Sequence, residues 1–400
     1  MLIQVLALGF TQTIAWASSI YLIAIVADPI ASDLGLTAST VFGAFSIALV
    51  VMGVCGPAVG RRIDERGGRD VLATSNVVIA CGLVLLSVAW NSAVLFAAWM
   101  VLGVGMALGL YDAAFAALVR TFGTEARAPI TGITLIAGFA STVGWPLTAL
   151  VVEMFGWRAS CIAWAATHVL IALPMNLIFI PATRHIADAA SAPSQASEPA
   201  SNVLAERMLM SGDLRRAFIL VTMFTAMAAF VTSAMAAHLP GLLLAFGATN
   251  AAALAAAALV GPAQVVARLV EFLAAQRFRF HPLITARVAV ALHPMGAILL
   301  LAFGGPPLTA SLFALMHGAG NGMVTIARGT LPLAIFGVAG YGRRQGLIGV
   351  SARAMQALAP YAFGVSLERF GPGAAIGLTV TFSLMALGAL MALRSKSDSP

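Results

Sequence analysis

Long runs of apolar residues occupy almost the whole of this 400-residue chain, and the charged residues are confined to the short gaps between the runs. Hydrophobic residues make up 60% of the chain and charged residues 9%, whereas soluble domains carry about 25% charged residues. A helix crosses a bilayer with about 20 mostly apolar residues, and only helices and closed barrels satisfy their backbone groups in lipid. Because the runs do not alternate polar and apolar residues as barrel strands do, the sequence predicts an all-α polytopic membrane protein.

Polar gaps divide the apolar runs into twelve predicted transmembrane helices. We expect these helices at residues 2–27, 37–59, 70–90, 93–119, 129–152, 158–180, 214–237, 249–271, 285–303, 308–336, 345–367 and 372–393. The longest polar stretch, 181–213, has an Ala/Ser/Pro-rich core that is typical of a flexible linker. This pattern predicts an N-terminal six-helix bundle at 1–180, a cytoplasmic linker at 181–213, and a C-terminal six-helix bundle with a short cytoplasmic tail at 214–400.

The two halves share short sequence features at equivalent places. Residues 153–156 (Glu-Met-Phe-Gly) follow the fifth span, and residues 368–371 (Glu-Arg-Phe-Gly) follow the eleventh, at an offset of 215 residues. The same offset relates Gly103 of the fourth span to Gly318 of the tenth. Many transporters are built from repeated halves that place a midplane site between two bundles. We therefore expect the two bundles to be pseudo-symmetric.

The positive charges define an orientation. With the N-terminus in the cytoplasm, Arg158 and Arg369 are the two of the 22 lysine and arginine residues that face outside, and Arg268, Arg328 and Arg353 lie within spans. All the others flank the cytoplasmic side, as the positive-inside rule requires. We therefore expect a multi-pass protein of a bacterial-type inner membrane with both termini in the cytoplasm. The basic charge reflects this topology, so we expect no nucleic-acid partner.

A loop rich in glycine and charge joins the second and third spans. Residues 60–69 read Gly-Arg-Arg-Ile-Asp-Glu-Arg-Gly-Gly-Arg. This loop resembles the signature loop of the major facilitator superfamily, with Glu65 where that family usually has arginine. The resemblance implies a transporter fold of two six-helix bundles. It also implies that the loop forms a cytoplasmic gate, for which the candidate residues are Gly60, Asp64, Arg66, Gly67 and Arg69.

Asp64 is the anionic residue of this loop. Arg343 and Arg344 precede the eleventh span on the same side of the membrane. Because a helix N-terminus carries partial positive charge, we expect Asp64 to meet that terminus and to hold the cytoplasmic side closed. The alternative is that these charges only anchor a tight loop and set the topology.

Ionisable residues within the spans cost about 2.5–3.5 kcal/mol each on insertion scales, so each one needs a reason. One helical face of the tenth span carries four polar residues, His317, Asn321, Thr325 and Arg328. A guanidinium suits carboxylate or phosphate, so we expect Arg328 and Asn321 to bind substrate. The alternative is a permanent ion pair of Arg328 with Asp112. His317 is a candidate proton site, and the alternative for it is a hydrogen-bonded structural role.

Asp112 is the one acidic residue well inside the first half. A carboxyl that is balanced between burial and a nearby cation can carry a proton. Asp112 is therefore our candidate for proton coupling, with a fixed salt bridge as the alternative. In the eleventh span Arg353 and Gln356 share a face and form a second candidate anion site. Arg268 and Glu271, three residues apart in the eighth span, predict a local salt bridge.

Aromatic and amide side chains mark the first and fourth spans. Gln12 and Trp16 line one face of the first span, and Tyr111 precedes Asp112 in the fourth. Such groups suit an organic solute that is partly aromatic, so all three residues are candidates for substrate binding. The alternative is that the aromatic residues only pack or anchor at the interface.

Several catalytic motifs are missing from the sequence. A P-loop needs a Gly-Lys-Ser/Thr element, and the single lysine, Lys396, lies in the tail. There is no His-Glu-x-x-His or Gly-x-Ser-x-Gly motif, and Cys55, Cys81 and Cys161 lie far apart in separate spans. We therefore expect no enzymatic activity, no cofactor and no metal.

Together these features predict a secondary active transporter that works by alternating access. We expect its substrate to be a small organic anion of the monocarboxylate type, moved with protons by a monomer in the lipid bilayer. One alternative is a carrier for a larger aromatic compound, either a vitamin such as riboflavin in uptake or a toxic compound in efflux. Another is a membrane sensor or assembly factor that moves no solute.

Overall fold

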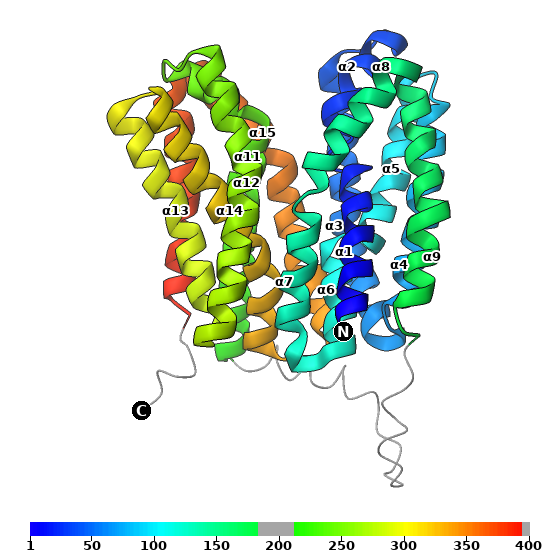
Figure 1. Cartoon of the computed structure of the whole chain (residues 1–400). Helices are drawn as coiled ribbons and strands as arrows, with labels where there is room; N and C mark the ends of the chain where they lie inside the picture. Colours follow the sequence, from blue (N-terminus) through cyan, green and yellow to red (C-terminus); the bar gives the residue numbers. More distant parts are fainter. Residues whose placement is uncertain (183–211, 394–400) are drawn as a thin grey trace, which may run out of the picture.

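The computed structural model describes residues 1–182 and 212–393, and within these residues it consists of helices and loops without a β-strand (Figure 1). The first half comprises α1 (Leu2–Ala17), α2 (Ile23–Leu34), α3 (Ala38–Arg66), α4 (Arg69–Ser87), α5 (Ser92–Gly109), α6 (Tyr111–Phe122), η1 (Gly123–Ala126), α7 (Arg127–Ala137), α8 (Ala140–Thr167), η2 (His168–Ala172) and α9 (Leu173–Phe179). The second half comprises α11 (Gly212–Ala245), α12 (Asn250–Phe278), α13 (Pro282–Phe303), α14 (Pro307–Phe336) and α15 (Tyr341–Met391). Most of the expected linker, 183–211, and the tail from residue 394 lie outside the described residues.

Short polar residues begin several of these helices. Thr37 accepts a hydrogen bond from the Thr40 amide at the start of α3, and Asn91 accepts one from the Val94 amide at the start of α5. Thr249 does the same for α12 with the amide of Ala252. A side-chain oxygen at this position satisfies one of the free N–H groups of the first turn. The polar gaps between apolar runs therefore fix where the spans begin.

Two of the long helices each join two successive predicted spans. α8 has non-helical backbone at Gly156 (φ 82°), and α15 has the same at Gly371 (φ 82°). These are the last residues of the two repeated tetrapeptides, and only glycine adopts such positive φ angles at little cost. The duplication seen in the sequence therefore has a structural counterpart, in which the fifth and eleventh spans end with the same backbone turn.

Three predicted spans of the first half are broken within their length, although the sequence predicts them as continuous helices. The first is divided between α1 and α2, the fourth between α5 and α6, and the fifth between α7 and α8. Between α5 and α6 the break is one extended residue, Leu110 (φ −80°, ψ −173°). No proline or charge marks Leu110, and hydropathy alone does not register a break of one residue. Broken helices at membrane depth expose backbone groups, and such groups are tolerated where protein surrounds them.

The described helices match the dimensions and composition of a membrane protein. Seven helical stretches among the described residues are long and apolar enough to cross a bilayer, and two of them, Ser92–Phe179 and Tyr341–Met391, are long enough for several crossings. Large apolar side chains are exposed on the outer surface, as Leu170 (72% exposed) and Leu254 (69% exposed) illustrate. Such a surface is stable against lipid and not against water. The prediction of an all-α polytopic membrane protein is therefore confirmed.

The hydrophobic cores separate into the two halves. One large cluster includes Trp99, Phe115 and Leu83 of the first half, and its buried residues from the second half are Leu333 and Tyr341. Two further clusters consist of second-half residues alone. The main contacts between the halves are made by α3, α6 and α7 with α12, α14 and α15. In Figure 1 the halves meet toward the end that carries the N-terminus and diverge toward the other end.

Candidate functional site

Glycines bring α3 and α15 into close contact between the two halves. Gly56 faces Gly346, and Gly60 faces Gly342. A Cβ at Gly60 would overlap the Gly342 carbonyl, and a Cβ at Gly346 would overlap the Gly56 carbonyl. Small residues at matched positions allow membrane helices to approach at backbone distance. This glycine contact fixes the register of α3 against α15 at the end where the halves meet.

Asp64 closes the same end of the interface. Its carboxylate oxygens accept hydrogen bonds from the amides of Gly342 and Arg343, each 2.8 Å long. These amides belong to the free N–H groups of the first turn of α15, where the helix dipole is positive. Burial raises the pKa of Asp64, and the two N–H bonds offset part of this rise. The contact between Asp64 and the N-terminus of the eleventh span, expected from the sequence, is therefore present.

The other candidate gate residues shape the loop after Asp64. Gly67 ends α3 with a positive φ of 88°, which favours glycine. Arg66 is exposed and Arg69 is half-buried, and neither forms an ion pair within the described residues. Gly60 lies in the glycine contact described above. The structure thus gives Gly60, Asp64 and Gly67 defined contacts or geometry at the closed end.

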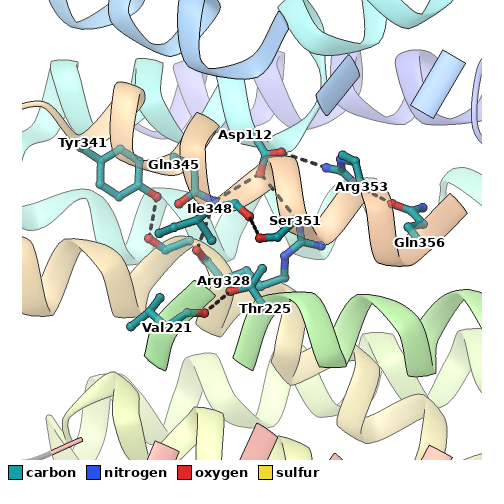
Figure 2. Close-up of polar contacts among 11 residues, drawn as sticks. Asp112, Val221, Thr225, Arg328, Tyr341, Gln345, Ile348, Ser351, Arg353 and Gln356 are labelled. Atoms are coloured by element: carbon teal, nitrogen blue, oxygen red, sulfur yellow. Dashed lines mark hydrogen bonds and ion pairs between the residues drawn. The ribbon is translucent and has the colours of Figure 1, made fainter. Parts of the chain in front are cut away.

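Asp112 lies at the centre of an ionic cluster between the halves (Figure 2). It sits in the first turn of α6, directly after the break at Leu110. Its Oδ2 accepts a hydrogen bond from Arg353 Nη2 at 2.9 Å. Its Oδ1 accepts one from Gln345 Nε2 at 3.2 Å and lies 3.9 Å from Arg328 Nη2. Two arginines of the second half therefore face one carboxylate of the first, and a small cavity bordered by Gly56 and Gly346 adjoins it.

The two arginines hold Asp112 differently. Arg353 is buried, with a side chain 4% exposed, and its Nη1 also donates to Gln356 Oε1 at 2.7 Å. The side chain of Arg328 is 20% exposed, and its nearest contact with Asp112 is 3.9 Å long. The Nε of each arginine is buried with no hydrogen-bond partner in the described part of the chain. The sequence analysis gave an Arg328–Asp112 ion pair as an alternative. That contact is present but is the longer of the two, and the shorter one is made by Arg353. An arginine held so loosely keeps donors available for another anion.

Gln345 is a contact of this cluster that the sequence analysis missed. It donates both to Asp112 and to the Arg328 carbonyl oxygen. Gln345 precedes Gly349 and Arg353 by one and two helical turns, so it shares their face of α15. The helical face that carries Arg353 and Gln356, followed toward the start of the eleventh span, includes Gln345, and this periodicity was the signal that could have identified it.

The expected salt bridge between Arg268 and Glu271 is not formed. Glu271 Oε1 instead pairs with Arg127 Nη2 at 3.0 Å and accepts a hydrogen bond from the Thr285 hydroxyl at 2.9 Å. Arg268 Nη1 donates to the Thr134 carbonyl oxygen at 2.6 Å. The prediction was wrong because a spacing of three places both side chains on one face of α12, and that face packs against α7, whose groups compete for both.

The aromatic candidates of the first half lie together. The rings of Trp16 and Tyr111 are 4.8 Å apart, those of Trp16 and Tyr21 are 6.0 Å apart, and those of Tyr21 and Trp145 are 5.6 Å apart. We call these four residues the aromatic group. Gln12 Nε2 donates to the Gly109 carbonyl at the break before α6. Gln12 Oε1 and Trp16 Nε1 are buried with no hydrogen-bond partner in the described part of the chain.

Asn321 and His317 of the tenth span have other partners. Asn321 Oδ1 accepts a hydrogen bond from the Thr232 hydroxyl at 2.9 Å. His317 Nδ1 lies 3.2 Å from His293 Nδ1, and both rings are buried within the second half. The structure thus brings Arg328 and Arg353 to Asp112, with Gln356 bonded to Arg353. It gathers Gln12, Trp16 and Tyr111 elsewhere, and it leaves Asn321 and His317 with neighbours of their own half.

Comparisons with known proteins place this geometry in context. The sequence model of the Major Facilitator Superfamily matches residues 8–360 of this chain. Structures of similar fold include Escherichia coli FucP in the outward conformation (TM-score 0.70, 12% identity, covering 97% of this chain and 98% of that chain). They also include the proton:xylose symporter XylE bound to 6-bromo-6-deoxy-D-glucose (0.75, 13%, 98% and 95%) and the human organic anion transporter MFSD10 (0.71, 16%, 97% and 98%). At these identities the structures show the fold alone.

A curated protein matches part of the sequence. An uncharacterized 38 kDa protein in the 23S RNA operon of Thermoproteus tenax is 30% identical over 148 residues. The match covers 37% of this chain and 38% of that protein.

Proposed function

The chain belongs to the Major Facilitator Superfamily and is therefore a membrane transporter and not an enzyme, and we propose that it moves a small organic anion together with protons by alternating access. The observation that carries this proposal is the cluster around Asp112. Two arginines of the second half converge on a single carboxylate of the first. Such a cluster holds an excess positive charge that an anion can neutralise.

The charges of the cluster explain how anion and proton would be coupled. With Asp112 ionised, Arg328, Arg353 and Asp112 carry a net charge of about +1. A proton on Asp112 raises this charge to about +2, and a bound monoanion brings it back to about +1. The empty carrier and the carrier with both a proton and an anion therefore have similar net charge. Buried net charge is costly, so the states with a higher charge are disfavoured. The two states of similar charge can change conformation most easily, which couples the two solutes.

Asp112 also connects the proton to the conformational change. Its hydrogen bonds to Arg353 and Gln345 join the two halves. Protonation weakens its attraction for both arginines, which frees their donors for the substrate, with Arg328 first because it is held more loosely. His317 is a second candidate for proton transfer. We favour Asp112, since His317 and its partner His293 both belong to the second half.

Asp64 and the glycine contact would form the gate at the end of the molecule where the two halves meet. We propose that the end carrying Asp64 faces the cytoplasm, with both termini, in a bacterial-type inner membrane, and that a monomer is sufficient for transport. The gate would open when α15 moves away from α3, because the bonds of Asp64 and the contacts of Gly60 and Gly346 all join these two helices.

Uptake into proteoliposomes with an imposed pH gradient tests the proposal. We expect Asp112→Asn to abolish pH-driven accumulation of a radiolabelled organic anion, because the amide cannot exchange a proton. The variant should keep substrate exchange between equal internal and external pools, which needs no proton turnover. Asp33→Asn is the matched control, since Asp33 pairs with Arg158 on the surface of the first half. Retention of pH-driven accumulation by Asp112→Asn would reject Asp112 as the coupling residue.

A second candidate function is transport of a larger aromatic compound, in uptake or in efflux. The aromatic group favours it, because four rings with one unused donor, Trp16 Nε1, and one unused acceptor, Gln12 Oε1, suit a flat polar solute. A thermal-shift screen of the purified protein that compares short carboxylates with neutral aromatic compounds separates the two functions. A protein that only senses or assembles would show no flux of any solute in the same vesicles.

A further inference from the structure

Arg268 is a buried arginine without a counter-charge. Arg268 and Arg353 are the two arginines that are buried among the described residues, at 4% and 3% exposure. Arg353 pairs with Asp112, whereas Arg268 forms no ion pair within residues 1–182 and 212–393. A buried charge without a partner of opposite sign is strongly unfavourable. The position therefore calls for an anion.

The groups that bind Arg268 are neutral and come from both halves. Nη1 donates to the Thr134 carbonyl oxygen at 2.6 Å, and Nε donates to the Gly322 carbonyl oxygen at 3.3 Å. Nη2 lies 3.2 Å from Gln264 Oε1 and 3.4 Å from Thr325 Oγ1. Bonds from a guanidinium to a carboxylate are about twice as strong as bonds between neutral groups. A carboxylate that reaches Arg268 would thus replace one of these partners.

Thr134 is the partner that can be exchanged. It lies in the last turn of α7, whose carbonyl groups carry the negative end of the helix dipole. The helix breaks immediately afterwards, and a Cβ at Gly138 would lie 2.8 Å from Arg268 Nη1. Glycine at this position leaves the space through which the guanidinium reaches the end of α7. Arg268 therefore serves as the cap of a broken helix that belongs to the other half.

The aromatic group adjoins this arginine. Tyr111 and Tyr21 both lie close enough to Arg268 for its charge to act on their hydroxyl groups. Trp16 packs on Tyr111, and the buried Trp16 Nε1 and Gln12 Oε1 have no protein partner in the described residues. A cation, a pair of aromatic rings, an unused N–H donor and an unused acceptor thus converge from α1, α6 and α12.

We propose that Arg268 binds the carboxylate of an aromatic carboxylic acid whose ring packs against the contacting pair Trp16 and Tyr111. The assignment rests on the proposed function and narrows its substrate class. It places the carboxylate on Arg268 instead of on the arginines of the Asp112 cluster, and the sum of the buried charges is again restored when one proton and one anion bind. The incoming carboxylate takes the place of the Thr134 carbonyl on Arg268. Substrate binding thereby releases one contact between the halves, while protonation of Asp112 releases another.

Calorimetric titration of the purified protein with 3-phenylpropionate, its neutral amide and lactate tests the assignment. We expect wild type to bind 3-phenylpropionate at least tenfold more tightly than the amide or lactate. Arg268→Gln should weaken 3-phenylpropionate binding at least tenfold and leave amide binding within threefold. Gly138→Ala keeps the charge but displaces the guanidinium, and it should weaken 3-phenylpropionate binding in the same direction.

Arg287→Gln is the matched control. Arg287 also donates to backbone carbonyls, those of Leu390 and Leu393, but within the second half alone. Its 3-phenylpropionate affinity should stay within threefold of wild type, and a melting temperature near wild type shows that each variant is folded. Should Arg268→Gln be misfolded, Arg268→Lys and Gly138→Ala provide the same comparison.

The remaining outcomes separate this assignment from the proposed function. If carboxylates bind but Arg328→Gln abolishes binding while Arg268→Gln does not, the anion lies at the Asp112 cluster; the assignment to Arg268 is then wrong, and anion transport stands. If lactate binds as tightly as 3-phenylpropionate, the aromatic class is wrong. If wild type binds none of the carboxylates, both the assignment and the proposed anion transport are wrong.

Discussion

The two halves touch along two interfaces that use different chemistry. Where α3 and α6 meet α15, the first half supplies the carboxylates, Asp64 on α3 and Asp112 on α6, and the second half supplies the donors. Between α7 and α12 each half supplies both kinds of group. There the first half supplies Arg127 and a helix carbonyl end, and the second half supplies Glu271 and Arg268.

The interfaces also differ in how closely the backbones approach. At α3 and α15 the glycine contact is made by backbone atoms, so the fit depends on shape and tolerates no added side chain. At α7 and α12 the contacts run through long side chains that can adjust. We infer from this difference that the α3–α15 interface fixes the register of the closed end. The α7–α12 interface adds polar contacts that, in our proposal, a ligand exchanges.

The largest expected effect comes from filling the glycine contact. Gly346→Leu would place a side chain in the space of the Gly56 carbonyl. Overpacking costs about 1–3 kcal/mol, so the closed population should fall by up to about 100-fold. Distances between spin labels at Arg62→Cys and Ala339→Cys, in a background without Cys55, Cys81 and Cys161, report the opening.

Gly43→Leu on α3, the helix that Gly346 contacts, is the control for this experiment. Gly43 has one neighbouring atom at 4.0 Å, so a side chain there meets open space. Its label distances should match those of the parent. Unchanged distances in Gly346→Leu would show that the glycine contact does not hold the end closed.

A smaller effect is expected from the second interface. Glu271→Gln removes the ion pair with Arg127, whose side chain is 25% exposed and can be solvated in part. We expect a loss of about 1–2 kcal/mol, below the roughly 3–5 kcal/mol of a fully buried pair. Labels at Thr124→Cys and Arg277→Cys should show about a tenfold shift toward the open state.

Glu125→Gln is the control for Glu271→Gln, because Glu125 is an exposed acid next to Arg127 in sequence. It should leave the label distances unchanged. An effect of Glu271→Gln larger than that of Gly346→Leu would reverse the ranking of the two interfaces.

The sequence predicts the parts of this fold that depend on solvent and on local geometry. The apolar runs locate the spans, and the repeated Phe-Gly at 156 and 371 marks equivalent backbone turns. The contact of Asp64 follows from one rule, that an anion favours a helix N-terminus. These features depend on neighbours in the chain or on the bilayer, which the sequence specifies directly.

Partner choice across the interface could not be predicted in the same way. Helical periodicity places Arg328 and Arg353 at suitable depth, but the distance of each to Asp112 depends on how α14 and α15 pack against α6. Arg268 and Glu271 share a face of α12, yet each bonds to groups on other elements. The break at Leu110, which presents Asp112 in the first turn of α6, has no mark in the sequence.

The central claim is that binding of one proton and one monoanion together leaves the net charge of the carrier unchanged. The most direct test is the voltage dependence of pH-driven anion uptake in proteoliposomes, with the membrane potential set by potassium and valinomycin. The account predicts that uptake follows the pH gradient and is the same at zero and at a strongly negative internal potential, because the loaded and empty carriers have equal charge. Uptake that is driven by the potential in the absence of a pH gradient would contradict it.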